Sequence, residues 1–368
     1  MFMSQSRMNM PSQLASVLTE LGCGQSVDNR WGIPLHFGSL VDEYWAARRG
    51  AGLIDLSALG KIQVTGRDRA RFLNGLCTND VKGLAAGEGC EAFFTNVQGK
   101  ILFCTRIFAE AESLWVDTVP GVVNALMVHL DRYHVMEKVE FADRTAEFAQ
   151  IALIGPRARE ELEQVSGTVV DLARLGHAEI TLAGSVCRQI SSDQLALPTF
   201  ELRVPASQAE TVWRELWRQG EVRGVRPLGA AAFEVLRIEA GFPLAGVDVD
   251  DSNLPQEIGR DRLSISFTKG CYLGQETIAR IDAMGHVNRH LVGLDLPGIS
   301  SAIPGGVPIV AQDKRIGHVT SSAVSPRCNH TIALGYVRRE YNKPGTAVSV
   351  VSDSQAIPAA ITSLPFGG

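Results

Sequence analysis

The densest group of chemically versatile side chains in this sequence lies in one stretch of eight residues. The stretch combines an ammonium, a thiol, a phenol, an amide and a carboxylate in the order Lys269-Gly270-Cys271-Tyr272-Leu273-Gly274-Gln275-Glu276. A segment that only filled a hydrophobic core would not carry so many polar groups. Because its two glycines permit backbone angles that other residues avoid, we expect a tight loop here, followed by a short helix over 276–281.

The chemistry that this stretch suggests is that of an activated thiol. If a helix follows the loop, its N-terminal amides favour a thiolate at Cys271. If the segment is extended, Lys269 and Cys271 lie on the same side, and a nearby ammonium lowers the pKa of a thiol. Our hypothesis is a reactive or ligand-facing Cys271. The alternative is a buried structural cysteine in a glycine-rich turn, since free cysteines are among the most buried residues.

Bulk properties narrow the class of protein. A length of 368 residues suggests two or three domains, and 45% hydrophobic with 20% charged residues is typical of soluble globular proteins. The net charge of -5 argues against nucleic-acid binding, and no apolar run approaches the ~18 residues of a membrane span. The seven cysteines are scattered and form no C-x-x-C pair. We therefore expect reduced thiols, a cytoplasmic location and no metal site.

Alternating and helical patterns in the first half predict two mixed units. The first has the order β-α-β-β-β-α-β, a ferredoxin-like pattern, over residues 61–66, 68–76, 91–97, 100–108, 113–119, 123–133 and 139–143. A second unit of similar rhythm runs from Gln150 to Ala240. From about Gly285 onward, short strand-like runs separated by turn residues predict a β-barrel or sandwich. The expected fold class is α+β.

Several common catalytic motifs are absent from the sequence, and one acidic segment resembles a calcium-binding loop only superficially. The sequence contains no G-x-G-x-x-G after a strand, no P-loop and no H-E-x-x-H. The segment 246–253 contains Asp248, Asp250 and Asp251, but its spacing is wrong for a calcium loop. We expect a solvated turn there.

Four segments resemble the YgfZ group, the folate-binding relatives of the glycine-cleavage T-protein (aminomethyltransferase). They are Leu236-Arg237-Ile238-Glu239-Ala240-Gly241-Phe242-Pro243, Gly246-Val247-Asp248, Leu254-Pro255-Gln256-Glu257 and the 269–276 block. The K-G-C-Y-x-G-Q-E block favours the YgfZ group, because the T-protein proper does not carry it. Segments 52–57, 72–80, 317–322 and 332–337 resemble the T-protein itself.

This resemblance implies a fold and a division into domains. The family has three domains in a ring around a central hole that holds folate, here two ferredoxin-like α+β units and a C-terminal β-barrel. By analogy, residues 1–54 and 148–284 form a discontinuous first domain. Residues 55–147 would be an inserted α+β domain, and residues 285–368 the barrel.

The sequence departs from the T-protein where that family places its functional residues. T-proteins carry a catalytic aspartate in the strand after an Asn-x-x-Gly hairpin, where this chain has Phe103 and Cys104. Leu197 stands where a glutamate holds the pterin ring, and Phe233 replaces an arginine. These differences argue against an active aminomethyltransferase.

The resemblance therefore predicts a YgfZ-like auxiliary protein that supports iron–sulfur cluster assembly or repair. Cys271 would be its functional thiol and Lys269 would tune it. Tetrahydrofolate would be the cofactor, contacted by Tyr272, Gln275, Glu276 and Glu257, and iron–sulfur enzymes would be its clients. No nucleic-acid or membrane partner is expected. The alternatives are a tetrahydrofolate-dependent aminomethyltransferase and a scaffold without a ligand.

Overall fold

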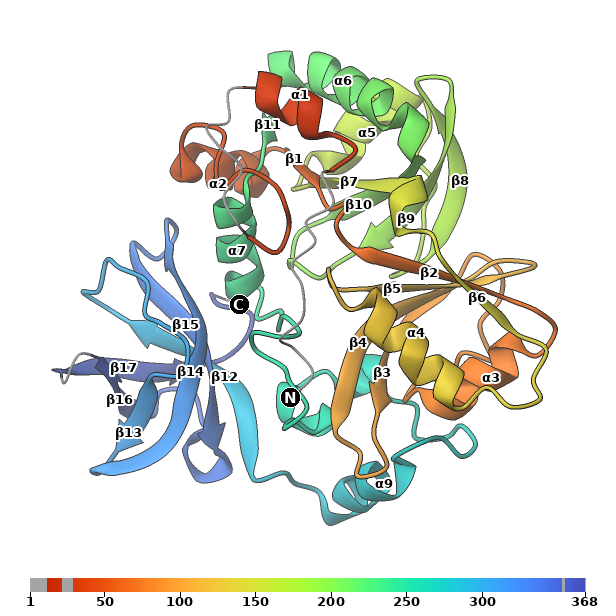
Figure 1. Cartoon of the computed structure of the whole chain (residues 1–368). Coiled ribbons are helices and arrows are strands. Elements are labelled where there is room, and N and C mark those ends of the chain that lie inside the picture. The colour runs from red at the N-terminus through yellow and green to blue at the C-terminus, as the bar shows by residue number, and fades with distance from the viewer. Residues whose placement is uncertain (1–11, 22–28, 353–354, 368) are drawn as a thin grey trace. The chain divides into compact units, whose positions relative to one another are not determined.

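The computed structural model describes residues 12–21, 29–352 and 355–367 (Figure 1). The chain divides into two compact units. Unit 1 comprises Met1–Ala92, Phe103–Asp193 and Leu197–Phe233; unit 2 comprises Phe93–Leu102, Gln194–Ala196 and Glu234–Gly368. The tip of one hairpin thus belongs to unit 2, although its strands continue in unit 1.

Unit 1 contains two sheets with helices. Sheet A is, in spatial order, β11 (Arg226–Pro227), β1 (Gly52–Asp55), β7 (Phe148–Ile154), β10 (Thr199–Pro205), β9 (Ser185–Ser192) and β8 (His177–Leu182). Sheet B is β3 (Gly89–Thr95), β4 (Ile101–Ala109), β5 (Leu114–Thr118), β2 (Gly60–Thr65) and β6 (Glu140–Asp143). The helices are α1 (Ala15–Glu20), α2 (Leu40–Arg49), α3 (Arg69–Leu76), α4 (Val123–Arg132), α5 (Ala158–Ser166) and α6 (Ala209–Gly220). The order β2-α3-β3-β4-β5-α4-β6 is the one that the hydrophobic pattern predicts.

Helix α6 illustrates why these segments fold as they do. Its apolar residues recur at helical spacing and bury Val212, Trp213 and Leu216, while Glu210 and Arg214 lie on the exposed side. Helices α5 and α6 both pack on strands of sheet A (Figure 1). The sheet therefore presents its other face to sheet B.

Unit 2 contains a closed six-stranded barrel. Its strands are, in order around the barrel, β12 (Arg289–Leu296), β15 (His330–Arg338), β14 (Lys314–Ser325), β13 (Pro308–Ala311), β16 (Ala347–Ser352) and β17 (Gln355–Thr362). Inward residues such as Leu294, Ile309 and Val350 form the barrel core. The unit also contains α8 (Asp261–Ser264), α9 (Gln275–Met284) and the end of α7 (Ala230–Glu239). The predicted α+β class and C-terminal barrel are confirmed.

Charged side chains lie buried between the two sheets of unit 1. Arg106 on β4 makes two hydrogen bonds to Glu201 on β10, one of them 2.9 Å long, and Arg203 pairs with Asp117. Lys61 is fully buried beside them, and its Nζ donates to the carbonyls of Ser57 at 3.1 Å and Leu59 at 2.7 Å. Sheet A is thus held to sheet B by ionic contacts as well as by apolar packing.

The buried position of Lys61 predicts a pH-dependent stability. Burial lowers the pKa of Lys61 to about 8, although Asp117 opposes the shift; an unfolded lysine titrates near ~10.4. Between these values the unfolded state binds more protons, so the free energy of unfolding rises with pH, by about 3 kcal/mol in total. Lys61→Met should remove this rise when denaturation is compared at pH 7.5 and 9.5.

The exposed Lys82 supplies a matched control for this measurement. Lys82→Met should keep the pH dependence of the native chain, because Lys82 is exposed and takes no part in the buried ionic layer. An unchanged pH dependence in Lys61→Met would contradict the assignment of the rise to Lys61.

Candidate functional site

The stretch 269–276 forms a loop that leads into α9, as its two glycines predict. Gly274 caps the helix at φ +84°, and Gln275 and Glu276 occupy the first turn. Tyr272 is buried against Ile265 and Ile278. The Nζ of Lys269 lies 5.1 Å from the centroid of the Tyr272 ring, so a cation–π contact joins two of the predicted site residues.

Cys271 is exposed on this loop. The alternative of a buried structural cysteine is therefore wrong, because the neighbouring Tyr272, not the thiol, enters the small apolar cluster. The reactivity of Cys271 stays a prediction.

The loop has a clear packing role against the turn between β3 and β4. Thr95 Oγ1 donates to the carbonyl of Leu273 at 2.7 Å. The turn is shaped by Asn96, whose Oδ1 accepts from the backbone of Gln98 and Lys100, each at 2.9 Å. A Cβ on Gly274 would stand only 2.5 Å from the carbonyl oxygen of Asn96. Only glycine allows this approach.

Gly274→Ala should therefore destabilise the protein more than an ordinary glycine substitution does. Gly285, at the other end of α9, is the matched control, because its φ is +75° but a Cβ there would meet no atom within 4 Å. Gly274→Ala should lower the free energy of unfolding by about 1 to 3 kcal/mol more than Gly285→Ala. If a denaturant titration showed that both variants lose the same free energy of unfolding, the close approach of Gly274 to the Asn96 carbonyl would be unimportant for stability.

Asp248 is a heavily hydrogen-bonded carboxylate of unit 2. Its Oδ2 accepts from Arg237 at 2.7 Å and from the backbone of Leu244 at 2.9 Å, and its Oδ1 accepts from the hydroxyls of Thr320 and Ser321. It therefore joins α7, the 242–253 segment and barrel strand β14. The expectation of a solvated turn is wrong at this residue, which is buried, and holds for the exposed carboxylates of Asp250 and Asp251.

Glu257 was expected to contact a ligand, but its described contacts tie protein segments together. Its Oε2 accepts from the backbone of Leu254 at 3.0 Å and lies 3.0 Å from Arg289 Nε. Arg289 also donates to the carbonyl of Ser252 at 2.9 Å, and Lys100 donates to the same oxygen at 2.7 Å. Two cations thus converge on one carbonyl beside the β3–β4 turn.

Phe103 and Cys104 lie on opposite faces of β4. The Phe103 ring is 5.6 Å from that of His129 on α4. Because side chains alternate along a strand, Cys104 shares the other face with Arg106. Both side chains are half-buried. Neither supplies a carboxylate, so this position has no acid or base of the usual family type.

Other residues related to family motifs have structural partners. Phe233, at the arginine position, is buried and packs edge-on against Trp31 at 5.1 Å. Glu201, near the pterin-binding motif, pairs with Arg106. Sequence patterns identified neither Asp248 nor Glu201 as buried ionic centres, because their partners lie 11 to 95 residues away along the chain.

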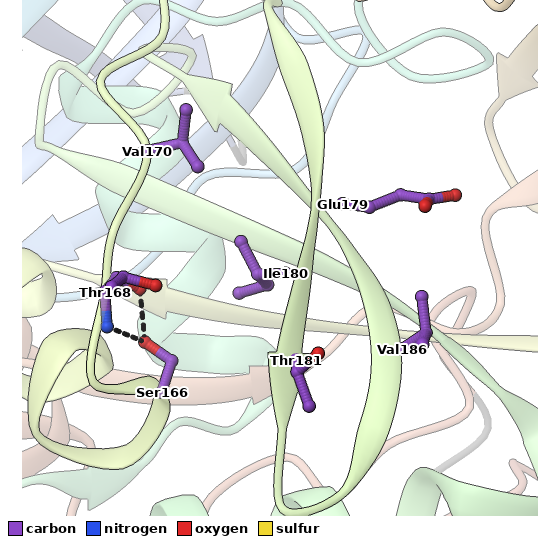
Figure 2. Close-up of a pocket in the computed structure, with 7 residues that line it drawn as sticks. All are labelled: Ser166, Thr168, Val170, Glu179, Ile180, Thr181 and Val186. Atoms are coloured by element: carbon purple, nitrogen blue, oxygen red, sulfur yellow. Dashed lines mark hydrogen bonds between the residues drawn. The ribbon is translucent and has the colours of Figure 1, made fainter.

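A shallow hollow of about 340 Å³ lies in unit 1 beside β8 (Figure 2). It is lined by Ser166, Thr168, Val170, Glu179, Ile180, Thr181 and Val186. The Ser166 hydroxyl is engaged with the carbonyls of Leu162 and Thr168. None of the predicted site residues lines this hollow. In the described part of the chain, no helix is long and apolar enough to span a membrane.

The fold and these sites define a mixed α+β protein that ends in a closed six-stranded barrel. The model of the GCVT N-terminal domain matches residues 14–268, and that of the glycine cleavage T-protein C-terminal barrel domain matches residues 289–367. The chain therefore belongs to the glycine-cleavage T-protein family.

Relatives of similar length carry consistent names. A "Probable aminomethyltransferase" of Natronomonas pharaonis is 34% identical over 355 residues, which cover 95% of this chain and 96% of that protein. An "Aminomethyltransferase" of Halothermothrix orenii is 29% identical, with coverage of 96% and 98%. The crystal structure of the glycine cleavage system aminomethyltransferase T from Bartonella henselae matches with a TM-score of 0.86 at 23% identity, covering 96% of this chain and 97% of that one. This last match shows a shared fold.

These comparisons correct the prediction of a YgfZ-like auxiliary protein for iron–sulfur assembly, and with it the predicted iron–sulfur clients. The relatives are named aminomethyltransferases over nearly the whole chain, which fits the alternative better. The prediction rested on several short segments, of which the 269–276 block favoured the YgfZ group, and on the departures from the T-protein at Phe103, Cys104, Leu197 and Phe233. The structure gives that block a local role, since Leu273 and Gly274 dock the β3–β4 turn. Such a block is a weaker guide to function than similarity along the whole chain.

Proposed function

We propose that this protein is a tetrahydrofolate-dependent aminomethyltransferase that works slowly. The observation that carries the proposal is the 34% identity to a "Probable aminomethyltransferase" over 95% of this chain. The protein would move the methylene carbon of an aminomethyl group from a carrier protein to tetrahydrofolate, with release of the amino nitrogen as ammonia and of the free carrier protein. Slow turnover follows from Phe103 and Cys104, because a positioned acid or base typically contributes 10²–10⁴-fold to a rate.

The residues that we expect to contact folate remain part of this proposal. Gln275 and Glu276 have no structural role among the described side-chain contacts that would be lost on substitution, whereas Tyr272 and Glu257 help to hold the protein together. Gln275 and Glu276 are therefore the better positions at which to test ligand binding.

Calorimetric titration of the full chain with tetrahydrofolate tests the proposal. We expect saturable binding that weakens in the Glu276→Ala variant, while Glu112→Ala, a change at an exposed residue outside the 269–276 block, leaves it unaltered. Absence of binding to the native chain would overturn the proposal. Equal binding by all three proteins would remove Glu276 from the proposed site and keep the folate requirement.

A thiol-reactivity measurement separately tests the predicted role of Cys271. If Lys269 activates this thiol, Lys269→Met should slow its alkylation at pH 7 relative to the native chain. An unchanged alkylation rate would show that Lys269 does not tune Cys271.

A further inference from the structure

Two rows of polar side chains face each other between sheets A and B of unit 1. Register pairing across sheet B places Arg106 opposite Asp117, and Asp117 opposite Lys61. Pairing across sheet A places Gln150 opposite Arg203. The rows are joined by the Arg106–Glu201 and Arg203–Asp117 ion pairs.

These contacts use only some of the hydrogen-bond donors of Arg203. Its Nη2 donates to Asp117, and its guanidinium carbon lies 4.8 Å from the Trp115 ring centroid and 5.8 Å from that of Phe108. The residue is 3% exposed, yet its Nε and Nη1 have no hydrogen-bond partner among the described residues. Such an unmet buried donor costs about 1–3 kcal/mol.

Gln150, the cross-strand neighbour of Arg203, lacks a donor for its side-chain oxygen, just as Arg203 lacks acceptors for two of its nitrogens among the described residues. Its Nε2 donates to Glu201, while its Oε1 is buried and has no partner in the described structure. The amide cannot be reversed, because its oxygen would then face the Glu201 carboxylate. Directly opposed residues of antiparallel strands hold their Cβ atoms about 4.5–5.5 Å apart, so the two side chains start next to each other on the same face of sheet A.

The surrounding charges restrict what can satisfy both residues. An anion would accept from Arg203 but would be repelled by the Gln150 oxygen and by the carboxylates of Asp117 and Glu201. A cation would be repelled by Arg203 and Arg106. Only a neutral group that both accepts and donates fits, and buried water meets such needs in proteins.

We propose that one ordered water molecule is bound between Arg203 and Gln150, accepting from the guanidinium and donating to the amide oxygen. This water completes the buried polar layer that joins sheet A to sheet B. It is independent of the proposed activity.

A high-resolution crystal structure of the native full chain tests the water site directly. We expect density about 2.7–3.2 Å from Gln150 Oε1 and from Arg203 Nε or Nη1, with the scattering of oxygen. A direct Gln150–Arg203 hydrogen bond that closes the gap, or an ion at this position, would overturn the proposal.

Water relaxation dispersion supplies a test in solution, and the chain offers a matched control. Gln189 is also fully buried, but its amide is paired on both sides with the backbone of Val170, at 3.2 Å and 2.8 Å. Gln150→Met should lose the signal of one long-lived water, whereas Gln189→Met should keep it. An equal signal in native protein and Gln150→Met would contradict the site. If Gln150→Met does not fold, the native crystal structure alone decides.

Discussion

Replacing Asp248 with alanine is expected to lower the free energy of unfolding of unit 2 by about 3–5 kcal/mol, the usual effect of breaking a buried ion pair. The change removes the acceptor of Arg237 and of the Thr320 and Ser321 hydroxyls. Arg237 is 1% exposed and, among the residues that the structure describes, would keep only Glu234 as a charged partner. Chemical denaturation of the full chain, followed by a probe in the barrel, measures the loss.

Asp251→Ala is the control for this prediction. Asp251 lies three residues along the same segment but is exposed, so its removal should change stability by no more than about 0.5 kcal/mol. Asp248→Asn keeps the shape of the side chain and should still be destabilising, because it removes the charge opposite Arg237. Equal denaturation midpoints for Asp248→Ala and Asp251→Ala would show that the buried contacts of Asp248 do not stabilise the protein.

Restoring a carboxylate on β4 should produce the largest change in activity. Cys104 shares a strand face with Arg106, and we expect Cys104→Asp to raise the rate of tetrahydrofolate-dependent transfer by about 10²–10⁴-fold. Phe103→Asp should not, because it would place the carboxylate toward α4 and His129. The rate at saturating tetrahydrofolate is the quantity to compare.

Cys104→Asn separates the effect of the carboxylate from that of side-chain size. The amide has nearly the same shape as aspartate but does not take up or release a proton near neutral pH, so its rate should stay near that of the native chain. If Cys104→Asp and Cys104→Asn behave alike, the missing acid does not limit the reaction.

The elements of this fold were largely predictable because they follow local patterns. The apolar spacing of α6 and the alternation of β2 are read directly from the residues. The same patterns do not predict the strands β1 and β17. Gly52–Asp55 is buried throughout and so does not alternate, and Gln355–Thr362 contains a proline and three alanines.

The sites were less predictable, because they depend on residues that are distant in the sequence. Nothing near Asp248 indicates that barrel hydroxyls more than 70 residues away will bind it. The 269–276 block was found from its composition, yet its main described contacts, through Leu273 and Gly274, are packing contacts with the β3–β4 turn. Composition identified an unusual segment and did not reveal what the segment contacts.

The most direct test of the central claim is a turnover assay of the native full chain with an aminomethylated carrier protein and tetrahydrofolate. We predict that methylene-tetrahydrofolate forms slowly, in proportion to the amount of this protein, and that Cys104→Asp forms it faster. No product above the level of a protein-free control, from either the native chain or Cys104→Asp, would contradict the assignment as an aminomethyltransferase.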